Sequence, residues 1–553
     1  MSADTLARRA SQLGGDTTWW RGAVIYEIYP RSFQDTNGDG IGDLKGIARR
    51  LDYVASLGVD AVWIAPFFTS PMDDFGYDVA DYRGVDPIFG SLADFDELLD
   101  RAHALGLRVL IDLVLSHTSD RHPWFAESRA DRTNPRANWY VWADPKPDGT
   151  APTNWLSFFG GPAWEWDGRR RQYYLHNFLV SQPDLNFHEP AVQDAVLDVA
   201  RFWLDRGVDG FRLDTANKYF HDAELRDNPP ITPDLSLSAM SPANPFSMQQ
   251  PVYNVNRPET LLFHERLRKL MDEYPATVAV GEIGVQLTSS RNLADYTAPG
   301  RLHMAYSFDL LGPDVTAPHI RAVLEKTERD GATWTSWSFS NHDVMRAATR
   351  FGAPPEATPM LIQLLACLRG TPTLYQGEEL GLCEAEVPFE RLRDPYGRRF
   401  WPSYRGRDGC RTPMPWQANA PNAGFSPAEP WLPVPADHAA AAVDAQEDDP
   451  GSPLARTRAF LAWRRGERVL YTGRIAFLDC GDAALAFTRT DGHGAGLLCA
   501  FNLTGAETTI TLRATAPPTA HAHGVTGGRA DGACIRLAPW GAFIGRLEGG
   551  NDG

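Results

Sequence analysis

The chain has 553 residues, 43% of them hydrophobic, and this length predicts two or three domains with a substantial buried core. The formal net charge is −17, because 70 Asp and Glu outnumber 53 Lys and Arg, and the basic residues form no long run. This acidic balance argues against nucleic acid or anionic lipid as a partner and suits a neutral substrate.

The six cysteines are few and scattered, and none shows the spacing of a metal-binding pair, so we expect reduced thiols. The N-terminal segment lacks a basic region followed by an apolar run. No stretch of the sequence is long and apolar enough to span a bilayer. These features predict a cytoplasmic protein that does not bind a membrane.

Short apolar runs rich in β-branched and aromatic residues recur eight times, separated in most cases by helical patterns. In chain order they are Ala23–Pro30, Val59–Pro66, Arg108–Leu115, Asp209–Ala216, Thr277–Ile283, His303–Leu310, Trp334–Asn341 and Thr371–Gly377. Eight strand–helix alternations predict an α/β fold whose parallel strands close into a (β/α)8 barrel. A doubly wound open sheet is the alternative, but no Gly-rich dinucleotide loop follows any strand.

Two intervals break this alternation of strand and helix patterns, and the pattern changes again near the C-terminus. We expect a catalytic barrel over residues 1–116 and 188–472, a small inserted domain over residues 117–187, and a long excursion over residues 384–449 after the eighth strand. Residues 473–553 contain short alternating runs divided by turn residues, which predicts an antiparallel β-domain.

Ionisable residues cluster at the ends of four predicted strands. The clusters are Asp112 with His117, Arg212 with Asp214, Glu282 alone, and His342 with Asp343. Each has a structural alternative, such as a helix cap, a buried polar network or an Arg–Asp pair on one strand face. Because the strand ends of one barrel converge on one pocket, an active site explains the four clusters together.

The segments DLVLSH, GFRLDTAN, GE and SNHD resemble, in order and spacing, the sequence regions of glycoside hydrolase family 13, the α-amylase clan. The resemblance runs from Tyr26 to about Trp416, and the C-terminal segment resembles the family's β-domain. Ser116 stands where Asn is usual in that family. QPDLNF (182–187) resembles the marker of the oligo-1,6-glucosidase and α-glucosidase branch.

The resemblance implies that Asp214 is the nucleophile, Glu282 the acid/base and Asp343 the stabiliser of the flattened sugar ring. Retention of configuration needs one carboxylate that attacks the anomeric carbon and one carboxylic acid that protonates the leaving oxygen. Arg212 beside Asp214 favours the ionised nucleophile, whereas an apolar strand and nearby carboxylates favour neutral Glu282.

The resemblance also implies a set of sugar-binding residues. His117 and His342 would donate hydrogen bonds to the sugar, and Tyr77 would stack under it. Asp78, partnered by Arg411, would bind the terminal hydroxyls and close the pocket; the alternative is an ordinary surface ion pair.

Thr215 follows the nucleophile and would lie near the leaving-group sugar. In the resembling branch, enzymes that favour α-1,6 bonds usually carry Val here, and those that favour α-1,4 bonds carry Thr or Ala. We therefore expect a preference for α-1,4 bonds.

DTNGDGIGD (35–43) resembles the start of an EF-hand loop, with oxygen-bearing residues at positions 1, 3, 5 and 9 and Gly at position 6. The Glu expected at position 12 is replaced by Gly46, and a polar turn is the alternative. The resembling branch binds a divalent ion at a matching loop. We expect a structural Ca2+, although Mg2+ stays open, with ligands from Asp35, Asn37, Asp39, Ile41 and Asp43.

These observations predict a retaining, exo-acting α-glucosidase for maltose and short α-glucosides, with transfer of glucose to alcohol acceptors and no organic cofactor. A sugar-rearranging or sucrose-acting glucosyltransferase, such as a trehalose synthase, shares the three acids and is the first alternative. An inactive carbohydrate-binding relative is the second, and the intact Asp214, Glu282 and Asp343 argue against it.

Overall fold

The computed structural model describes residues 16–232, 243–284, 291–492, 496–512, 519–520 and 522–547. Among these residues, eight parallel strands form one sheet in the order β11-β10-β9-β5-β2-β1-β13-β12. The strands are β1 (Ile25–Ile28), β2 (Ala61–Ile64), β5 (Arg108–Leu113), β9 (Gly210–Leu213), β10 (Val278–Ile283), β11 (Met304–Ser307), β12 (Ser336–Trp337) and β13 (Thr371–Tyr375). A parallel bridge between Ala305 and Thr335 joins the two edges. The predicted (β/α)8 barrel is confirmed, and the open sheet is wrong.

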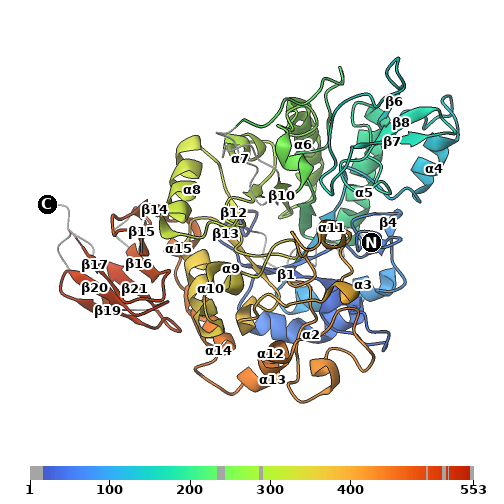
Figure 1. Cartoon of the computed structure of the whole chain (residues 1–553). Helices are drawn as coiled ribbons and strands as arrows, with labels where there is room; N and C mark the ends of the chain where they lie inside the picture. The colour runs from blue at the N-terminus through green and yellow to red at the C-terminus, as the bar shows by residue number, and fades with distance from the viewer. Residues whose placement is uncertain are drawn as a thin grey trace.

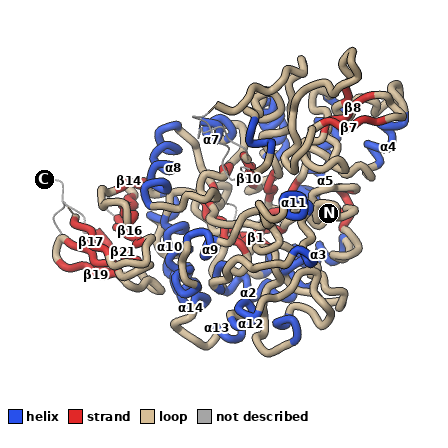
Figure 2. Tube along the Cα trace, in the orientation of Figure 1, coloured by secondary structure: helices blue, strands red, loops and turns tan. Residues whose placement is uncertain are grey.

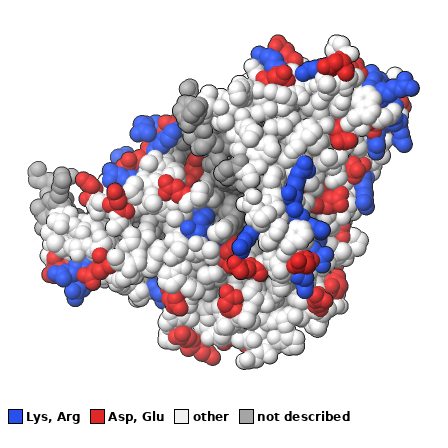
Figure 3. Space-filling view, viewed as in Figure 1, with Lys and Arg blue, Asp and Glu red and all other residues white. Residues whose placement is uncertain are grey.

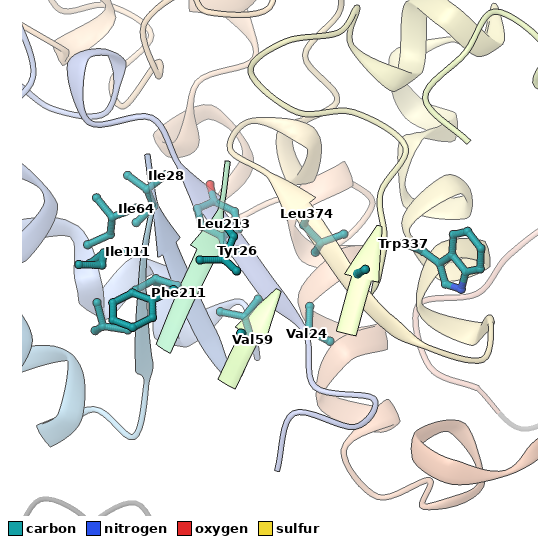
Figure 4. Close-up of a cluster of buried hydrophobic side chains, with 14 of the residues drawn as sticks. Val24, Tyr26, Ile28, Val59, Ile64, Ile111, Phe211, Leu213, Trp337 and Leu374 are labelled. Carbon is teal, nitrogen blue, oxygen red and sulfur yellow. The ribbon is translucent and has the colours of Figure 1, made fainter. Parts of the chain in front are cut away.

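Each strand is the inner part of a predicted apolar run. Residues 209–216, for example, contain β9 over Gly210–Leu213, so Asp214 lies immediately past the carboxyl end of its strand. Every residue of β9 and of β1 is buried on both faces, as expected for parallel strands covered by helices. Figure 4 shows side chains of β1, β2, β5 and β9 in one apolar cluster.

Helices surround this sheet (Figures 1 and 2). Those of the described barrel residues are α2 (Leu44–Ser56), α3 (Leu92–Ala104), α5 (Pro190–Arg206), α6 (Pro258–Met271), α7 (Arg291–Tyr296), α8 (Ala317–Asp330), α9 (Ala347–Phe351), α10 (Thr358–Cys367), α14 (Pro453–Arg464) and α15 (Val469–Thr472). Local sequence explains their ends. Ser91 and Asp94 form a capping box at the start of α3, and Gly207, with φ of 99°, ends α5.

Two segments extend from the carboxyl ends of β2 and β5. After β2, the hairpin of β3 (Phe68–Thr69) and β4 (Asp81–Val85) holds the loop that carries Tyr77. After β5, the expected insertion contains α4 (Pro123–Ala130) and an antiparallel sheet. Its strands are β6 (Trp142–Ala143), β7 (Trp164–Asp167) and β8 (Gln172–Leu175). A bridge between His117 and Asp184 ties the two ends of the insertion together.

The excursion after β13 consists of short helices and loops. The elements are η4 (Glu378–Leu380), η5 (Phe389–Arg391), α11 (Pro395–Phe400), η6 (Pro421–Gly424), α12 (Ala436–Ala440) and α13 (Val443–Gln446). Further 3-10 turns are η1 (Pro30–Ser32), η2 (Pro245–Met248) and η3 (Pro355–Ala357). Phe159 of the insertion packs on Tyr396 of α11, so the two segments meet over the barrel.

The C-terminal segment folds into two antiparallel sheets beside the barrel, on the side away from β6–β8 (Figure 1). Their strands are β14 (Arg474–Phe477), β15 (Ala484–Thr490), β16 (Gly496–Asn502), β17 (Thr508–Thr511), β18 (Thr519–Ala520), β19 (Gly528–Asp531), β20 (Cys534–Leu537) and β21 (Ala542–Leu547). The sheet orders are β14-β15-β16-β21-β18 and β17-β20-β19. The predicted antiparallel β-domain is confirmed.

In the part of the chain that the structure describes, each helix is too short or too polar to cross a bilayer. All six cysteines are unpaired. Acidic and basic side chains are interspersed over the face shown in Figure 3, without a large patch of one sign.

Candidate active site

Asp214 and Glu282 come from the neighbouring strands β9 and β10, which pair in parallel with Leu213 opposite Gly281. Both carboxyls line one cavity above the carboxyl ends of the strands, together with Asp343. The chain turns sharply after Asp214, and Thr215 adopts a left-handed φ of 42°. In that conformation its amide donates a hydrogen bond of 2.9 Å to Glu282 Oε2. The turn after Asp214 therefore holds the carboxyl of Glu282.

Arg212 of β9 holds three acids with one buried guanidinium. Its Nη1 lies 2.8 Å from Asp214 Oδ1 and 3.0 Å from Asp112 Oδ1, and its Nη2 lies 2.9 Å from Glu282 Oε2. Tyr306 Oη completes the set at 2.8 Å from Nη2. One planar guanidinium thus contacts both Asp214 and Glu282, which keeps these two carboxyls close to each other.

The pKa values of the two carboxyls lie in the order that double displacement requires. Burial raises the pKa of Asp214 to about 6, against the opposing charge of Arg212. Burial raises the pKa of Glu282 to about 7, against the same charge of Arg212, and the nearby carboxylates of Asp214 and Asp343 add to the increase. This order of the two pKa values suits an ionised Asp214 beside a protonated Glu282.

Asp343, after β12, is fixed by two arginines. Arg411 Nη2 lies 2.8 Å from its Oδ1, and Arg407 Nη1 lies 3.1 Å from the same atom. His342 and these two positive charges hold the pKa of Asp343 well below its usual value despite its burial. Asp343 therefore keeps its negative charge at the cavity wall, where it could stabilise a developing positive charge.

The expected pair of Asp78 and Arg411 is wrong. Asp78 is fully buried and accepts hydrogen bonds from Ser70 Oγ at 2.8 Å and from the amides of Asp73 and Asp74. Burial raises its pKa to about 6, and its carboxylate closes the turn that carries Tyr77. Arg411 is used by Asp343 and by the carbonyl oxygen of His342.

Asp74 and Arg407 take the place of the expected pair. Arg407 Nη2 donates to Asp74 Oδ1 at 2.9 Å and to Asp394 Oδ1 at 2.8 Å, and both Asp74 and Arg407 line the cavity. Gln182, from the QPDLNF segment, donates to the other oxygen of Asp74 at 3.1 Å. Each pairing residue lies four positions from the one expected, on the same two segments, so segment-level similarity alone could not separate them.

The two histidines are neutral at physiological pH, because burial lowers the pKa of each to about 3. His117 lines the cavity, with Nε2 lying 3.0 Å from the carbonyl oxygen of Tyr77. His342 lies between Glu27 at Nδ1 and the hydroxyl of Tyr77, 2.6 Å from Nε2, and its ring stacks on Tyr77. The structure therefore brings His117, His342 and Tyr77 together at the site. Both ring nitrogens of His342, however, already have protein partners.

The loop 35–43 is curled around the carboxylate of Asp35. The amides of Asn37, Gly38 and Gly40 all donate to this carboxylate, at 2.7–2.9 Å. Asn37 Nδ2 lies 3.1 Å from Asp39 Oδ2, and Asp43 accepts from Thr36 and caps α2. Within the described residues, no cluster of three or more His, Cys, Asp or Glu suits a metal ion. The oxygen chemistry fits Ca2+, but the site would depend on the Asn37 amide and the Ile41 carbonyl besides the acids.

Sequence reasoning missed most of the cavity wall. Six aromatic side chains that the sequence did not single out line the cavity: Phe158, Phe159, Phe178, Phe308, Tyr396 and Tyr404. Lys218, four residues after the nucleophile, also lines it. The phenylalanines lie in irregular segments without periodicity, so the sequence gives no signal that they gather at the site. Lys218 could have been suspected from the sequence, because it directly follows the segment GFRLDTAN (210–217) that contains Asp214.

A closed (β/α)8 barrel with three acids on one cavity at its carboxyl face is an arrangement that suits a glycoside hydrolase or glycosyltransferase. Residues 27–473 match the catalytic domain of α-amylase, and the chain belongs to this family, in its α-glucosidase and oligo-1,6-glucosidase branch.

The similarity to individual proteins extends over nearly the whole chain. It is 54% identical to a probable α-glucosidase of Rhizobium meliloti (strain 1021), over 97% of this chain and 98% of the relative. It is similar to the crystal structure of an α-glucosyl transfer enzyme, with a TM-score of 0.94 and 56% identity over 96% of this chain and 99% of the other. The crystal structure of the trehalulose synthase of Pseudomonas mesoacidophila MX-45 is less similar. Its TM-score is 0.86 and its sequence identity is 31%, over 96% of this chain and 99% of the synthase chain.

Proposed function

We propose that this enzyme is a retaining, exo-acting α-glucosidase that also transfers glucose to alcohols. The observation that carries the proposal is the shared guanidinium of Arg212, which holds Asp214 and Glu282 at one cavity. The similarity to a probable α-glucosidase and to an α-glucosyl transfer enzyme supports the same activity. The lower identity to a trehalulose synthase makes a sugar-rearranging enzyme the weaker alternative.

In the first step, a carboxylate oxygen of Asp214 attacks the anomeric carbon of the terminal glucose. The bond to the leaving oxygen breaks, its electron pair stays on that oxygen, and Glu282 supplies the proton. In the second step, ionised Glu282 takes a proton from water or an alcohol. The resulting oxygen nucleophile attacks the anomeric carbon and releases Asp214. Two inversions give net retention, and the choice between water and alcohol decides between hydrolysis and transfer.

A buried charged cluster beside the acids supports exo action. Asp74, Arg407 and Asp394 form a network, with Arg407 only 8% exposed, and we propose that this network closes the cavity behind the terminal glucose. The oxygen atoms of Asp74 and the donors of Arg407 are suited to bind the hydroxyls of that glucose. An internal glucose of a long chain would need an open cleft at this place. We therefore propose maltose and short α-glucosides as substrates, with α-1,4 bonds preferred.

Product analysis tests this proposal. The enzyme should release α-glucose from maltose and from an aryl α-glucoside, and soluble starch should lose little of its average chain length. With an added alcohol, α-glucosides of that alcohol should appear. Rapid shortening of starch would exclude exo action. Rearrangement of sucrose or maltose as the main reaction would favour the weaker alternative, and no activity on any of these sugars would favour an inactive relative.

We further propose that the loop 35–43 holds a structural Ca2+ through Asp35, Asn37, Asp39, Ile41 and Asp43. The curled loop and its oxygen-only chemistry support the proposal. The cation would stabilise the fold near α2 and take no part in the reaction.

We also propose a cytoplasmic location, which the six unpaired cysteines support and which fractionation of cells can test.

A further inference from the structure

The cavity has an aromatic part that the reaction chemistry leaves unexplained. Besides the acids and Tyr77, it is lined by six aromatic side chains, and three of them (Phe158, Phe308 and Tyr404) are only half-buried, so that they offer ring surface to a ligand. A terminal glucose held between Asp74 and Asp214 would not use this wall. The aromatic part therefore belongs to the group that leaves or accepts glucose.

Lys218 is the one lysine that lines this cavity, among the residues that the structure describes. It follows the turn after the nucleophile, where its amide donates to the carbonyl oxygen of Thr215 at 2.9 Å. The side chain is 6% exposed. Its Nζ lies 4.2 Å from the ring centre of Phe178 and 4.9 Å from that of Phe158. Within the described part of the chain, no hydrogen bond or ion pair reaches Nζ.

This ammonium lies at the wall of the cavity, nearly buried against two aromatic rings and without a counter-ion in contact, so the carboxylate of a ligand in the cavity could pair with it. The charges that act on it most strongly, beside burial, are those of Glu282, Asp184 and Asp214, with Glu282 first. In the proposed mechanism Glu282 protonates the leaving oxygen, and Lys218 lines the same cavity as Glu282, so its ammonium is within reach of the aglycone. Burial lowers the pKa of Lys218 to about 8, so the side chain is still mostly charged at neutral pH.

We propose that Lys218 and the aromatic wall form an acceptor and aglycone subsite that selects a planar apolar group carrying a carboxylate. The ring of such a group would lie against Phe158, Phe308 and Tyr404, and its carboxylate would pair with the Lys218 ammonium. This inference rests on the proposed glucosidase function and adds the class of aglycone.

A matched pair of substrates tests it: 4-carboxyphenyl α-glucoside and the methyl ester of the same compound. The two differ in one negative charge at the far end of the ring. At about pH 6.5, below the pKa of Lys218, the ratio of kcat/KM for acid over ester should fall about tenfold in Lys218→Met. The loss should appear mainly in KM, and Lys218→Arg should restore most of it. Lys269→Met, which removes an exposed positive charge from α6, serves as the control and should leave the ratio unchanged.

The outcomes separate the two proposals. If Lys218 only packs against the phenylalanines, Lys218→Met would slow both substrates equally, and the subsite is overturned. The same holds if neither substrate is affected. If the wild-type enzyme cleaves neither glucoside, the glucosidase function itself fails. As a second measurement, 4-hydroxybenzoate and its methyl ester should compete as acceptors, with the acid losing its advantage in Lys218→Met alone.

Discussion

The amide of Thr215 donates a 2.9 Å hydrogen bond to Glu282 Oε2, so the residue after Asp214 positions the carboxyl of Glu282. This contact needs the left-handed φ of 42° at Thr215, a conformation that costs a β-branched residue energy and persists only where its surroundings fix it. Asp214 and Glu282 are therefore coupled through the backbone as well as through Arg212.

The first prediction concerns these two acids. Asp214→Ala should lower kcat by at least about three orders of magnitude, because no other group can form the glucosyl intermediate. Glu282→Gln should be nearly inactive on maltose, since an amide cannot protonate the leaving oxygen. Steady-state rates, with circular dichroism to show that both variants fold, check the prediction. Activity of Asp214→Ala within tenfold of the wild type would reject the assignment.

The second prediction is a narrow pH optimum. Catalysis needs ionised Asp214 and protonated Glu282. Activity should thus rise with pH through the Asp214 pKa of about 6 and fall through the Glu282 pKa of about 7. Because the groups are coupled, the two limbs of kcat/KM describe the pair. With α-glucosyl fluoride, whose leaving group needs no proton, the alkaline limb should weaken or vanish. A full alkaline limb on the fluoride would contradict the role of Glu282.

The third prediction separates the observed pocket network from the expected one. Arg407→Met leaves Asp74 and Asp394 without their buried cation, so KM for maltose should rise about tenfold or more. The melting temperature should also fall, since breaking a buried ion pair costs roughly 3–5 kcal/mol. Arg405→Met, which removes an exposed ion pair with Glu386, is the matched control. A large increase in KM for Asp78→Asn, without one for Arg407→Met, would restore the pairing expected from sequence.

The barrel could be predicted from the sequence, because each buried parallel strand is a short apolar run that is recognisable from local sequence alone. The positions of Asp214 and Glu282 followed, since residues at the carboxyl ends of strands must converge. The contact between Asp74 and Arg407 could not be predicted in the same way. It depends on how the loop after β2 packs on the excursion after β13, and the sequence pattern does not distinguish Arg407 from Arg411, four residues later. The aromatic wall was missed for the same reason, because loops bring together Phe158 and Phe308.

The fourth prediction concerns the loop 35–43. If it holds a structural Ca2+, exhaustive chelation should lower the melting temperature, and added Ca2+ should restore it by mass action. Asp39→Ala removes one proposed ligand that is not part of the helix cap at Asp43, and it should make the melting temperature insensitive to Ca2+. Kinetic constants should change little. An unchanged melting curve after chelation, with no metal in elemental analysis, would remove the site.

The last prediction concerns linkage and begins with the position of Thr215. The sequence places its hydroxyl near the leaving group, free to bond a sugar oxygen. In the structure Thr215 lines the cavity, but Oγ1 also lies 2.9 Å from Ser116 Oγ and 3.3 Å from Asp214 Oδ2. A hydroxyl has one proton, so Thr215 can donate to Asp214, to Ser116 or to an acceptor oxygen, and not to all three.

Thr215→Val keeps the shape but removes that proton, so two effects should separate. Loss of the bond to Asp214 lowers activity on every substrate, by up to about tenfold. Loss of the bond to the leaving group changes only the ratio of kcat/KM between maltose and isomaltose. We expect the wild type to cleave maltose faster than isomaltose, and Thr215→Val to shift kcat/KM toward isomaltose by up to roughly tenfold. Ser116→Ala, which removes the competing partner of Thr215, should not shift the ratio toward isomaltose. If the wild type cleaves isomaltose faster, or if Thr215→Val slows both sugars equally, Thr215 acts on the nucleophile alone.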